Sequence, residues 1–138
     1  MNIATQLKRL GATPAMIAGT LVDGKLLADA EAEAKAKPHK LDDMNKTEAR
    51  FAAELDWMIY NKQVSRYLFG TVKFRLAKRT WYCPDFVVFW ADGVIECVEI
   101  KGFVRDDAAV KYKVAREKFP MFKWRMIRRG KDGWENVL

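Results

Sequence analysis

The sequence predicts an α/β protein whose core runs helix, three strands, helix, strand, with a mixed central sheet flanked by helices. The chain has 138 residues, half of them apolar, which suits one domain with a substantial core. Apolar residues recur at helical spacing in two segments, and they alternate or run continuously in several others. We expect this core over residues 45–138, preceded by a helical extension over residues 1–44 that is flexible or used for contacts.

The first core helix is expected to begin at a capping box. Asn45 is followed three residues later by Glu48, the spacing at which each side chain can cap the backbone of the other. Apolar residues from Phe51 onward recur at helical spacing, which predicts a helix to about Tyr60. Upstream, residues 25–37 are rich in alanine, glutamate and lysine, a composition with good helix propensity.

Three strands are expected next. Residues 72–77 alternate between apolar and basic side chains, as in a strand with one buried face. Residues 81–90 form a nearly continuous apolar and aromatic run, which is typical of a buried strand. The turn sequence Ala91-Asp92-Gly93 joins this run to a third strand over residues 94–101.

The second core helix is expected to start at Asp106 or Asp107 and to end near Phe119. Residues 122–126 then alternate as a fourth strand, and residues 134–138 suit a short edge strand. Short connections make the first three strands an antiparallel meander. The second helix is long enough to carry a right-handed crossover to a parallel strand.

The composition narrows the possible chemistry. A net charge of +7 fits a partner of polyanions such as nucleic acid, and it equally fits a solvated basic surface. Cys83 and Cys97 form no CxxC pair and His39 is the single histidine, so we expect no zinc site and no histidine base. No apolar run reaches about 18 residues and no signal peptide is evident, so we expect a cytoplasmic protein without membrane contact.

The turn at residues 91–93 sets the register of the hairpin. A three-residue loop makes Trp90 face Val94, and counting from that pair places Asp85 opposite Glu99. Lys101 follows Glu99 by two residues and shares its sheet face. Two facing carboxylates are unfavourable without compensation, and a hard divalent cation such as Mg²⁺ supplies it. A slip of one residue would separate the two carboxylates onto opposite faces.

A purely structural interpretation stays open at this point. The same three charges would also suit strand ends that reach solvent, with Lys101 paired to Glu99 or Asp85. Glu48 likewise has a structural role as the third residue of its capping box. It also shares the helix face that packs on the sheet, so its carboxylate can point toward a metal at the edge of the core.

These residues resemble the PD-(D/E)XK nuclease signature: Pro84-Asp85, thirteen intervening residues, then Glu99-Ile100-Lys101. The glutamate in the first helix and the order of elements match that superfamily as well. A longer match looks like a group of small bacteriophage and prophage proteins within it, long catalogued as a domain of unknown function. It covers roughly residues 45–128 and comprises Asn45-Lys46-Thr47-Glu48-Ala49-Arg50-Phe51, Pro84-Asp85-Phe86, Glu99-Ile100-Lys101-Gly102-Phe103 and Arg105-Asp106-Asp107-Ala108.

The resemblance implies a restriction-endonuclease-like fold and metal-dependent hydrolysis of DNA phosphodiester bonds. It implies that Asp85, Glu99 and the Ile100 carbonyl hold Mg²⁺, for which Mn²⁺ can substitute, and that Glu48 binds the metal directly or through water. Lys101 would orient or help to deprotonate the attacking water and offset charge in the transition state. Glu48, Asp85, Glu99 and Lys101 are therefore the expected catalytic residues.

Basic side chains around this core are expected to contact phosphates. Arg105 is the strongest candidate because it follows Lys101 closely; Lys111 and Lys113 on the second helix and Lys73 and Arg75 on the first strand come next. A further basic cluster lies near the C-terminus and comprises Lys123, Arg125, Arg128, Arg129 and Lys131.

The preferred hypothesis is a DNA endonuclease that cuts branched structures such as Holliday junctions. Sequence-specific cleavage, mismatch nicking and cleavage of single strands stay open. The alternative hypotheses are a catalytically inactive DNA-binding protein and a regulatory protein with an acidic partner. We expect a homodimer, because one active site cuts one strand at a time, and Trp57 and Tyr60 are candidates for its interface.

Overall fold

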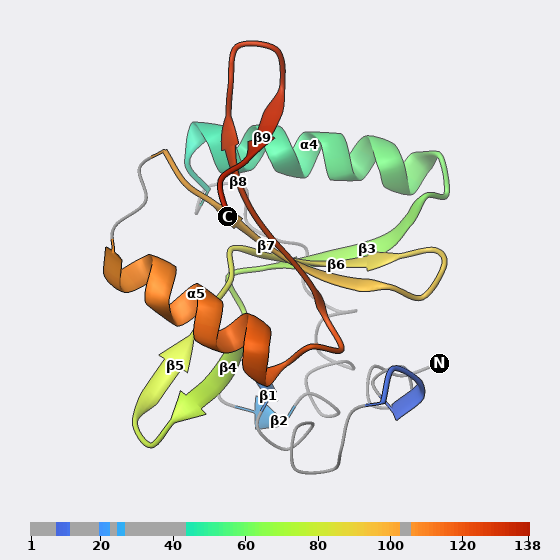
Figure 1. Cartoon of the computed structure of the whole chain (residues 1–138). Helices are drawn as coiled ribbons and strands as arrows, with labels where there is room; N and C mark the ends of the chain where they lie inside the picture. Colours follow the sequence, from blue (N-terminus) through green and yellow to red (C-terminus); the bar gives the residue numbers. More distant parts are fainter. Residues whose placement is uncertain (1–7, 12–19, 23–24, 27–43, 103–105) are drawn as a thin grey trace.

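The computed structural model describes residues 8–11, 20–22, 25–26, 44–102 and 106–138 (Figure 1). The protein has the predicted α/β class. A mixed five-stranded sheet carries a helix against each face, and a second, smaller sheet lies beside it (Figure 1). In the described residues, neither long helix has the length and apolar character that a membrane crossing requires.

The main sheet has the strand order β3-β6-β7-β8-β9. Neighbouring strands are antiparallel except β7 and β8, which are parallel. The parallel pair follows from the crossover through helix α5, as the sequence predicts. The strands are β3 (Val64–Phe69), β6 (Phe86–Trp90), β7 (Ile95–Ile100), β8 (Lys123–Arg129) and β9 (Trp134–Asn136).

The smaller sheet has the order β2-β1-β4-β5 and is antiparallel throughout. Its strands are β1 (Thr20–Val22), β2 (Lys25–Leu26), β4 (Val72–Ala77) and β5 (Thr80–Tyr82). The β4–β5 hairpin is thus an insertion in the chain between two paired strands of the main sheet, β3 and β6. When the hairpin is set aside, the main sheet and its helices follow the predicted order of helix, three strands, helix, strand.

Helix α4 (Lys46–Tyr60) starts at the predicted capping box. The backbone N–H of Glu48 donates to the Asn45 side chain and that of Asn45 donates to the Glu48 carboxylate, both at 2.9 Å. Helix α5 (Asp106–Lys118) carries Asp106 and Asp107 in its first turn, where their negative charges suit the helix dipole. Both helices therefore begin with acidic side chains.

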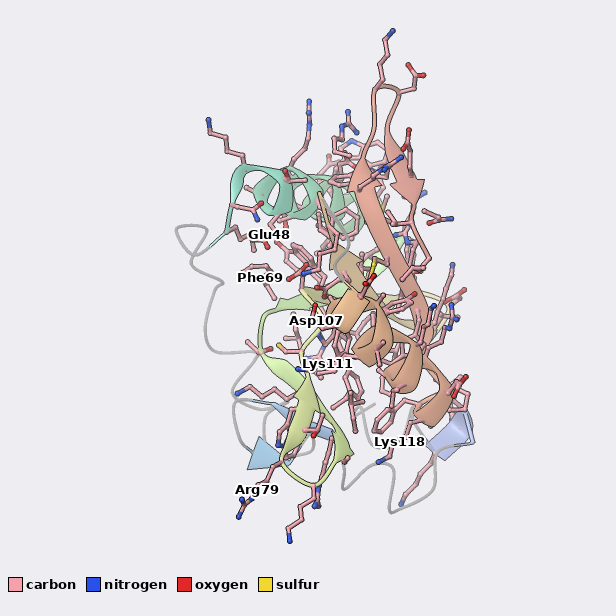
Figure 2. The ribbon with its side chains drawn as sticks, turned by 60° about the vertical axis from the view of Figure 1, so that its left-hand side comes forward. Glu48, Phe69, Arg79, Asp107, Lys111 and Lys118 are labelled. Carbon is pink, nitrogen blue, oxygen red and sulfur yellow. The ribbon has the colours of Figure 1, made fainter. Side chains whose placement is uncertain are left out.

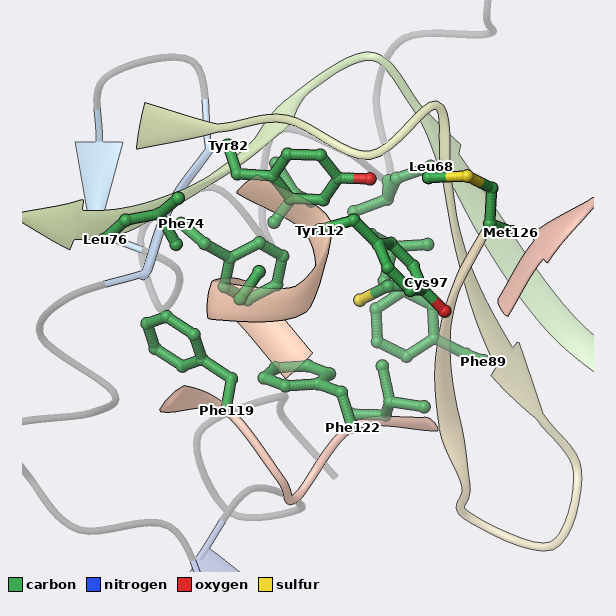
Figure 3. Close-up of a cluster of buried hydrophobic side chains, with 14 residues drawn as sticks. Leu68, Phe74, Leu76, Tyr82, Phe89, Cys97, Tyr112, Phe119, Phe122 and Met126 are labelled. Atoms are coloured by element: carbon green, nitrogen blue, oxygen red, sulfur yellow. The ribbon is translucent and has the colours of Figure 1, made fainter. Parts of the chain in front are cut away.

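The core lies on both faces of the main sheet. On one face α4 packs its apolar stripe, including Phe51 and Leu55, against alternate residues of β6 and β7. On the other face α5 and the β4–β5 hairpin enclose an aromatic cluster around Phe74, Tyr82 and Tyr112 (Figure 3). The hairpin insertion therefore completes the second half of the core.

Three expectations about the strands need correction. Residues 72–77 form the predicted strand, but it belongs to the smaller sheet; the first strand of the main sheet is β3, which the sequence analysis missed. Residues 81–90 are not one strand, since the chain leaves β5 at Tyr82 and starts β6 at Phe86. The edge strand expected over 134–138 ends at Asn136.

The helical extension expected over residues 1–44 is wrong where strands β1 and β2 are formed. The backbone of β1 pairs with β4, so this segment extends the smaller sheet. A strand edge left open by β4 offers backbone hydrogen bonds that local helix propensity cannot match. Most of the helix expected over residues 25–37 lies outside the described residues.

Candidate active site

The β6–β7 hairpin has the register that the sequence predicts. Trp90 donates its N–H to the Val94 carbonyl at 2.9 Å, and Phe86 pairs with Val98. Continuing that register by one residue sets Asp85 opposite Glu99, at the end of the sheet where β6 begins and β7 ends. The three-residue turn has therefore fixed the juxtaposition of the two carboxylates.

Asp85 is held where the chain passes from the smaller sheet to the main sheet. Its Oδ2 accepts a hydrogen bond from the Ile100 backbone N–H at 2.8 Å, and its own carbonyl accepts one from Gly70 at 2.8 Å. Gly70 has φ of +63°, a left-handed conformation that glycine adopts without strain. These two bonds join Asp85 to β7 on one side and to the end of β3 on the other.

Glu99 is buried and has both carboxylate oxygens engaged. Its Oε1 lies 2.8 Å from the Lys101 Nζ, and its Oε2 accepts a hydrogen bond from the Tyr82 hydroxyl at 3.0 Å. Glu99 and Lys101 thus share one face of β7, as the alternation predicts. Of the two ion pairs left open by the sequence, the Glu99–Lys101 pair is formed.

Burial and the neighbouring carboxylates perturb the acidity of the site. Desolvation, then the charge of Glu99 and more weakly that of Glu48, raise the pKa of Asp85 from 3.8 to about 7 against the opposing effect of the Ile100 N–H. Burial lowers the pKa of Lys101, but its hydrogen bond to Glu99 and the charges of Glu99, Asp85 and Glu48 together outweigh burial, so the pKa is raised. The charge of Glu48 therefore reaches both groups.

Glu48 takes part in the cap and lies near the site. One of its oxygens accepts the Asn45 N–H, so the structural role expected for it is present. In Figure 2, Glu48, Phe69, Asp107 and Lys111 follow one another down one side of the molecule. The first turns of both helices thus lie on the side of the protein where the sheet ends at Asp85.

Tyr82 is the site residue that the sequence analysis missed. Its side chain is 8 % exposed, and its ring packs edge-on against Tyr112 with centroids 6.5 Å apart. Burial, followed by the charge of Glu99 and the hydrogen bond to it, raises the pKa of the Tyr82 hydroxyl, so this group stays a hydrogen-bond donor. Pro84 offered the one available signal, because a proline inside an apolar run indicates a break between strands.

Whether a metal ion fits this site depends on the side-chain oxygen atoms that could bind it. In the part of the chain that the structure describes, no group of three or more acidic, histidine or cysteine side chains is assembled as a ready cage for a metal. Asp85, which is partly buried, and Glu99, which is buried, nevertheless supply carboxylates at facing positions of two paired strands. Mg²⁺ is commonly bound by one or two carboxylates and several waters, so this pair fits such a metal.

The predicted phosphate-binding residues do not form one patch. Lys73 and Arg75 are exposed on the outer surface of β4, while Phe74 between them packs on Phe119 of the core. Lys111 is exposed on the side of α5 that Figure 2 shows together with Glu48.

Lys113 is also exposed, but it lies about 200° around the helix from Lys111 and faces away from it. Arg105 lies outside the described residues. Lys111 is thus the α5 lysine that the structure brings to the same side as Glu48.

Several cations of the expected C-terminal cluster are paired. Arg125 and Lys123 contact the fully buried Glu96 at 2.8 Å and 3.2 Å, and Arg128 contacts Glu135 at 3.0 Å. These cations neutralise carboxylates of the same sheet, so they contribute less to a free basic surface than their number suggests.

Comparison with known protein families identifies the family to which the chain belongs. Residues 28–132 match the profile of a family described as a protein of unknown function, DUF1064. The chain belongs to this family. Searches of the curated proteins and of the solved structures give no match. The matched segment contains Glu48, Asp85, Glu99 and Lys101, so the whole site described above lies inside the segment that matches the family profile.

Proposed function

We propose that this protein is a metal-dependent endonuclease of the PD-(D/E)XK type that hydrolyses DNA phosphodiester bonds in the cytoplasm. The observation that carries the proposal is the juxtaposition of Asp85 and Glu99 across two strands, with Lys101 on Glu99. A carboxyl group whose pKa is strongly raised by desolvation and a neighbouring charge, as that of Asp85 is, is a recurrent mark of functional sites.

The charge balance of the site supports a divalent cation. Glu48, Asp85 and Glu99 contribute three carboxylates that affect one another, and among the described residues one ammonium group, that of Lys101, pairs with them. When all are ionised, the deficit of two positive charges equals the charge of one Mg²⁺ or Mn²⁺. Such an ion would supply Lewis acidity for the scissile phosphate and for an attacking water.

In the proposed reaction each residue of the site would have a distinct role. Asp85 and Glu99, with the Ile100 carbonyl, would hold the metal, and Glu48 would bind it directly or through water. Lys101 would orient the attacking water. It would also offset the negative charge on the phosphate while the water oxygen bonds to phosphorus and the bond from phosphorus to the leaving sugar oxygen breaks. The Ile100 N–H and the Tyr82 hydroxyl would keep the two carboxylates in place.

DNA would be held mainly through its backbone. Lys111 would bind phosphates on the Glu48 side of the protein, and Lys73 and Arg75 would bind other phosphates at the outer surface of the β4–β5 hairpin. No separate element for reading bases is evident in the described residues, which favours recognition of DNA shape. Branched DNA, including four-way junctions, is therefore the first substrate to test.

The decisive experiment offers the protein labelled linear duplex, single strand and four-way junction in Mg²⁺, Mn²⁺ or EDTA. Asp85→Asn and Lys101→Ala are compared with Asp132→Asn, which removes an exposed carboxylate far along the sequence from the site. We expect metal-dependent cleavage by the wild type and the control, and none by the two site variants. Salt-sensitive binding of DNA without any cleavage would instead support the inactive DNA-binding protein.

A further inference from the structure

The outer face of α4 carries a regular stripe of side chains. Lys46, Arg50, Ala53, Trp57 and Tyr60 follow one another at spacings of four, three, four and three residues, which places them on one side of the helix. All five are exposed, and the two aromatics stand out because Trp57 is 63 % and Tyr60 85 % exposed. We call these five residues the α4 stripe.

Neighbouring positions on the helix have partners within the fold. Glu54 accepts a hydrogen bond from the indole N–H of Trp134 at 2.8 Å, on the side facing β9. Asp56 accepts one from the Tyr67 hydroxyl at 3.0 Å, on the side facing β3. The flanks of α4 are thus occupied by the protein itself, and no contact with another described element accounts for the exposed indole of Trp57.

The order of residues in the α4 stripe has an internal symmetry. Its two cations, Lys46 and Arg50, occupy the N-terminal half, and its two aromatics, Trp57 and Tyr60, occupy the C-terminal half. Ala53, the smallest residue, lies in the middle. A second α4 laid antiparallel across the first would therefore set cations on aromatic rings at both ends and two small side chains at the crossing point.

We propose that the α4 stripe is the interface of a two-fold symmetric dimer of this chain. The two α4 helices run antiparallel, with the axis beside Ala53 of each subunit. Arg50 packs over the partner's Trp57, and Lys46 over the partner's Tyr60, and the symmetry repeats each contact. Interfaces with a two-fold axis need this kind of self-complementary surface.

The chemistry of the stripe favours this arrangement over its alternatives. Arginine and lysine over aromatic rings attract through the ring quadrupole, most strongly with tryptophan. A parallel pairing would face cation with cation, so the charges select the antiparallel pairing. The alanine lets the helix axes approach to the usual 8–10 Å. Tryptophan, tyrosine and arginine are also the residues most enriched at the energetic centres of interfaces.

The interface and the proposed nuclease site involve different residues. Glu48 points to the sheet side of α4, whereas the α4 stripe points away from it. Dimerisation is therefore tested without measuring cleavage, and its failure would leave the proposed function untouched.

The test measures the mass of the full chain in solution by sedimentation equilibrium over a series of concentrations. Trp57→Arg should raise the dimer dissociation constant at least about tenfold, because two cation–π contacts become two arginine–arginine contacts. Arg50→Trp alone also removes both arginine–tryptophan pairs, so it should raise the dissociation constant as well. The double variant that carries both substitutions restores them with the partners exchanged, and its dissociation constant should return to within about threefold of the wild-type value.

A matched control replaces Trp81, an exposed tryptophan of β5 outside the α4 stripe, by arginine. It should leave the dissociation constant unchanged. A wild-type protein that stays monomeric at every concentration would overturn the proposal, and so would a dimer that survives Trp57→Arg. Failure of the double variant to recover would show that the two stripes do not pair antiparallel. The proposal would also be overturned if residues 1–43 or DNA, and not a second copy of the chain, covered the α4 stripe.

Discussion

Replacing Asp85 by asparagine should stabilise the metal-free protein at neutral and alkaline pH. The pKa of Asp85 rises from 3.8 to about 7, chiefly because burial and the charge of Glu99 disfavour its ionised form. In the unfolded chain the same group ionises near 3.8. The Asp85 carboxyl therefore favours the folded state most below pH 4, and that contribution is lost as the pH rises through 7.

The magnitude follows from the size of this shift. A rise of about three units corresponds to about 4 kcal/mol at 1.36 kcal/mol per unit. Asparagine keeps an oxygen that can accept the Ile100 N–H and carries no charge. Because solvent still reaches part of the Asp85 carboxyl, we expect a gain of about 2 kcal/mol at pH 8.5, or roughly 6–10 °C in Tm.

Thermal and urea unfolding of the wild type and the variant in EDTA at pH 4 and pH 8.5 measures this gain. The two proteins should differ by less than about 1 kcal/mol at pH 4, where Asp85 is protonated in the folded state and roughly half ionised in the unfolded chain. Adding Mg²⁺ at pH 8.5 should stabilise the wild type more than the variant. A variant that is less stable than the wild type at pH 8.5, or equally shifted at both pH values, would refute the reasoning.

Three further predictions concern other parts of the molecule. Tyr82→Phe removes the hydroxyl bonded to Glu99 but keeps the packed ring, so we expect weaker Mn²⁺ binding by calorimetry with a loss of unfolding free energy of only about 1 kcal/mol; unchanged metal affinity would contradict this. Replacing Lys73 and Arg75 by alanine should weaken DNA binding and reduce the slope of log affinity against log salt by about two if each contacts one phosphate. Asn45→Ala removes a helix cap and should cost about 1 kcal/mol in urea unfolding; a loss within error would show that other contacts fix the start of α4.

The elements fixed by local chemistry could be predicted from the sequence. The capping box at Asn45 positions α4 because its two hydrogen bonds involve residues three positions apart. The hairpin register follows from a three-residue turn, so the facing of Asp85 and Glu99 is a local property as well. The crossover through α5 needs only a helix of sufficient length between two strands. In each case the deciding contacts lie within a short stretch of chain.

The assignment of strands to sheets could not be predicted in this way. The alternation of residues 72–77 marks a strand with one buried face, but it does not say which sheet that strand joins. Strand β3 has a weak pattern because an irregularity between Val64 and Arg66 shifts the register against β6. A bulge breaks the period of two on which recognition of a strand depends. Pairing partners are set by long-range packing, which local patterns do not encode.

Two carboxylates on strand β7 have opposite environments, and the contrast bears on function. Glu96, on one face, is fully buried and contacts two cations, Arg125 and Lys123. Glu99, on the other face, shares a single ammonium with two neighbouring carboxylates. The fold thus supplies ample positive charge to a buried carboxylate where only structure is concerned. Retaining a deficit of positive charge a few residues away costs stability, and binding of a divalent cation would recover it.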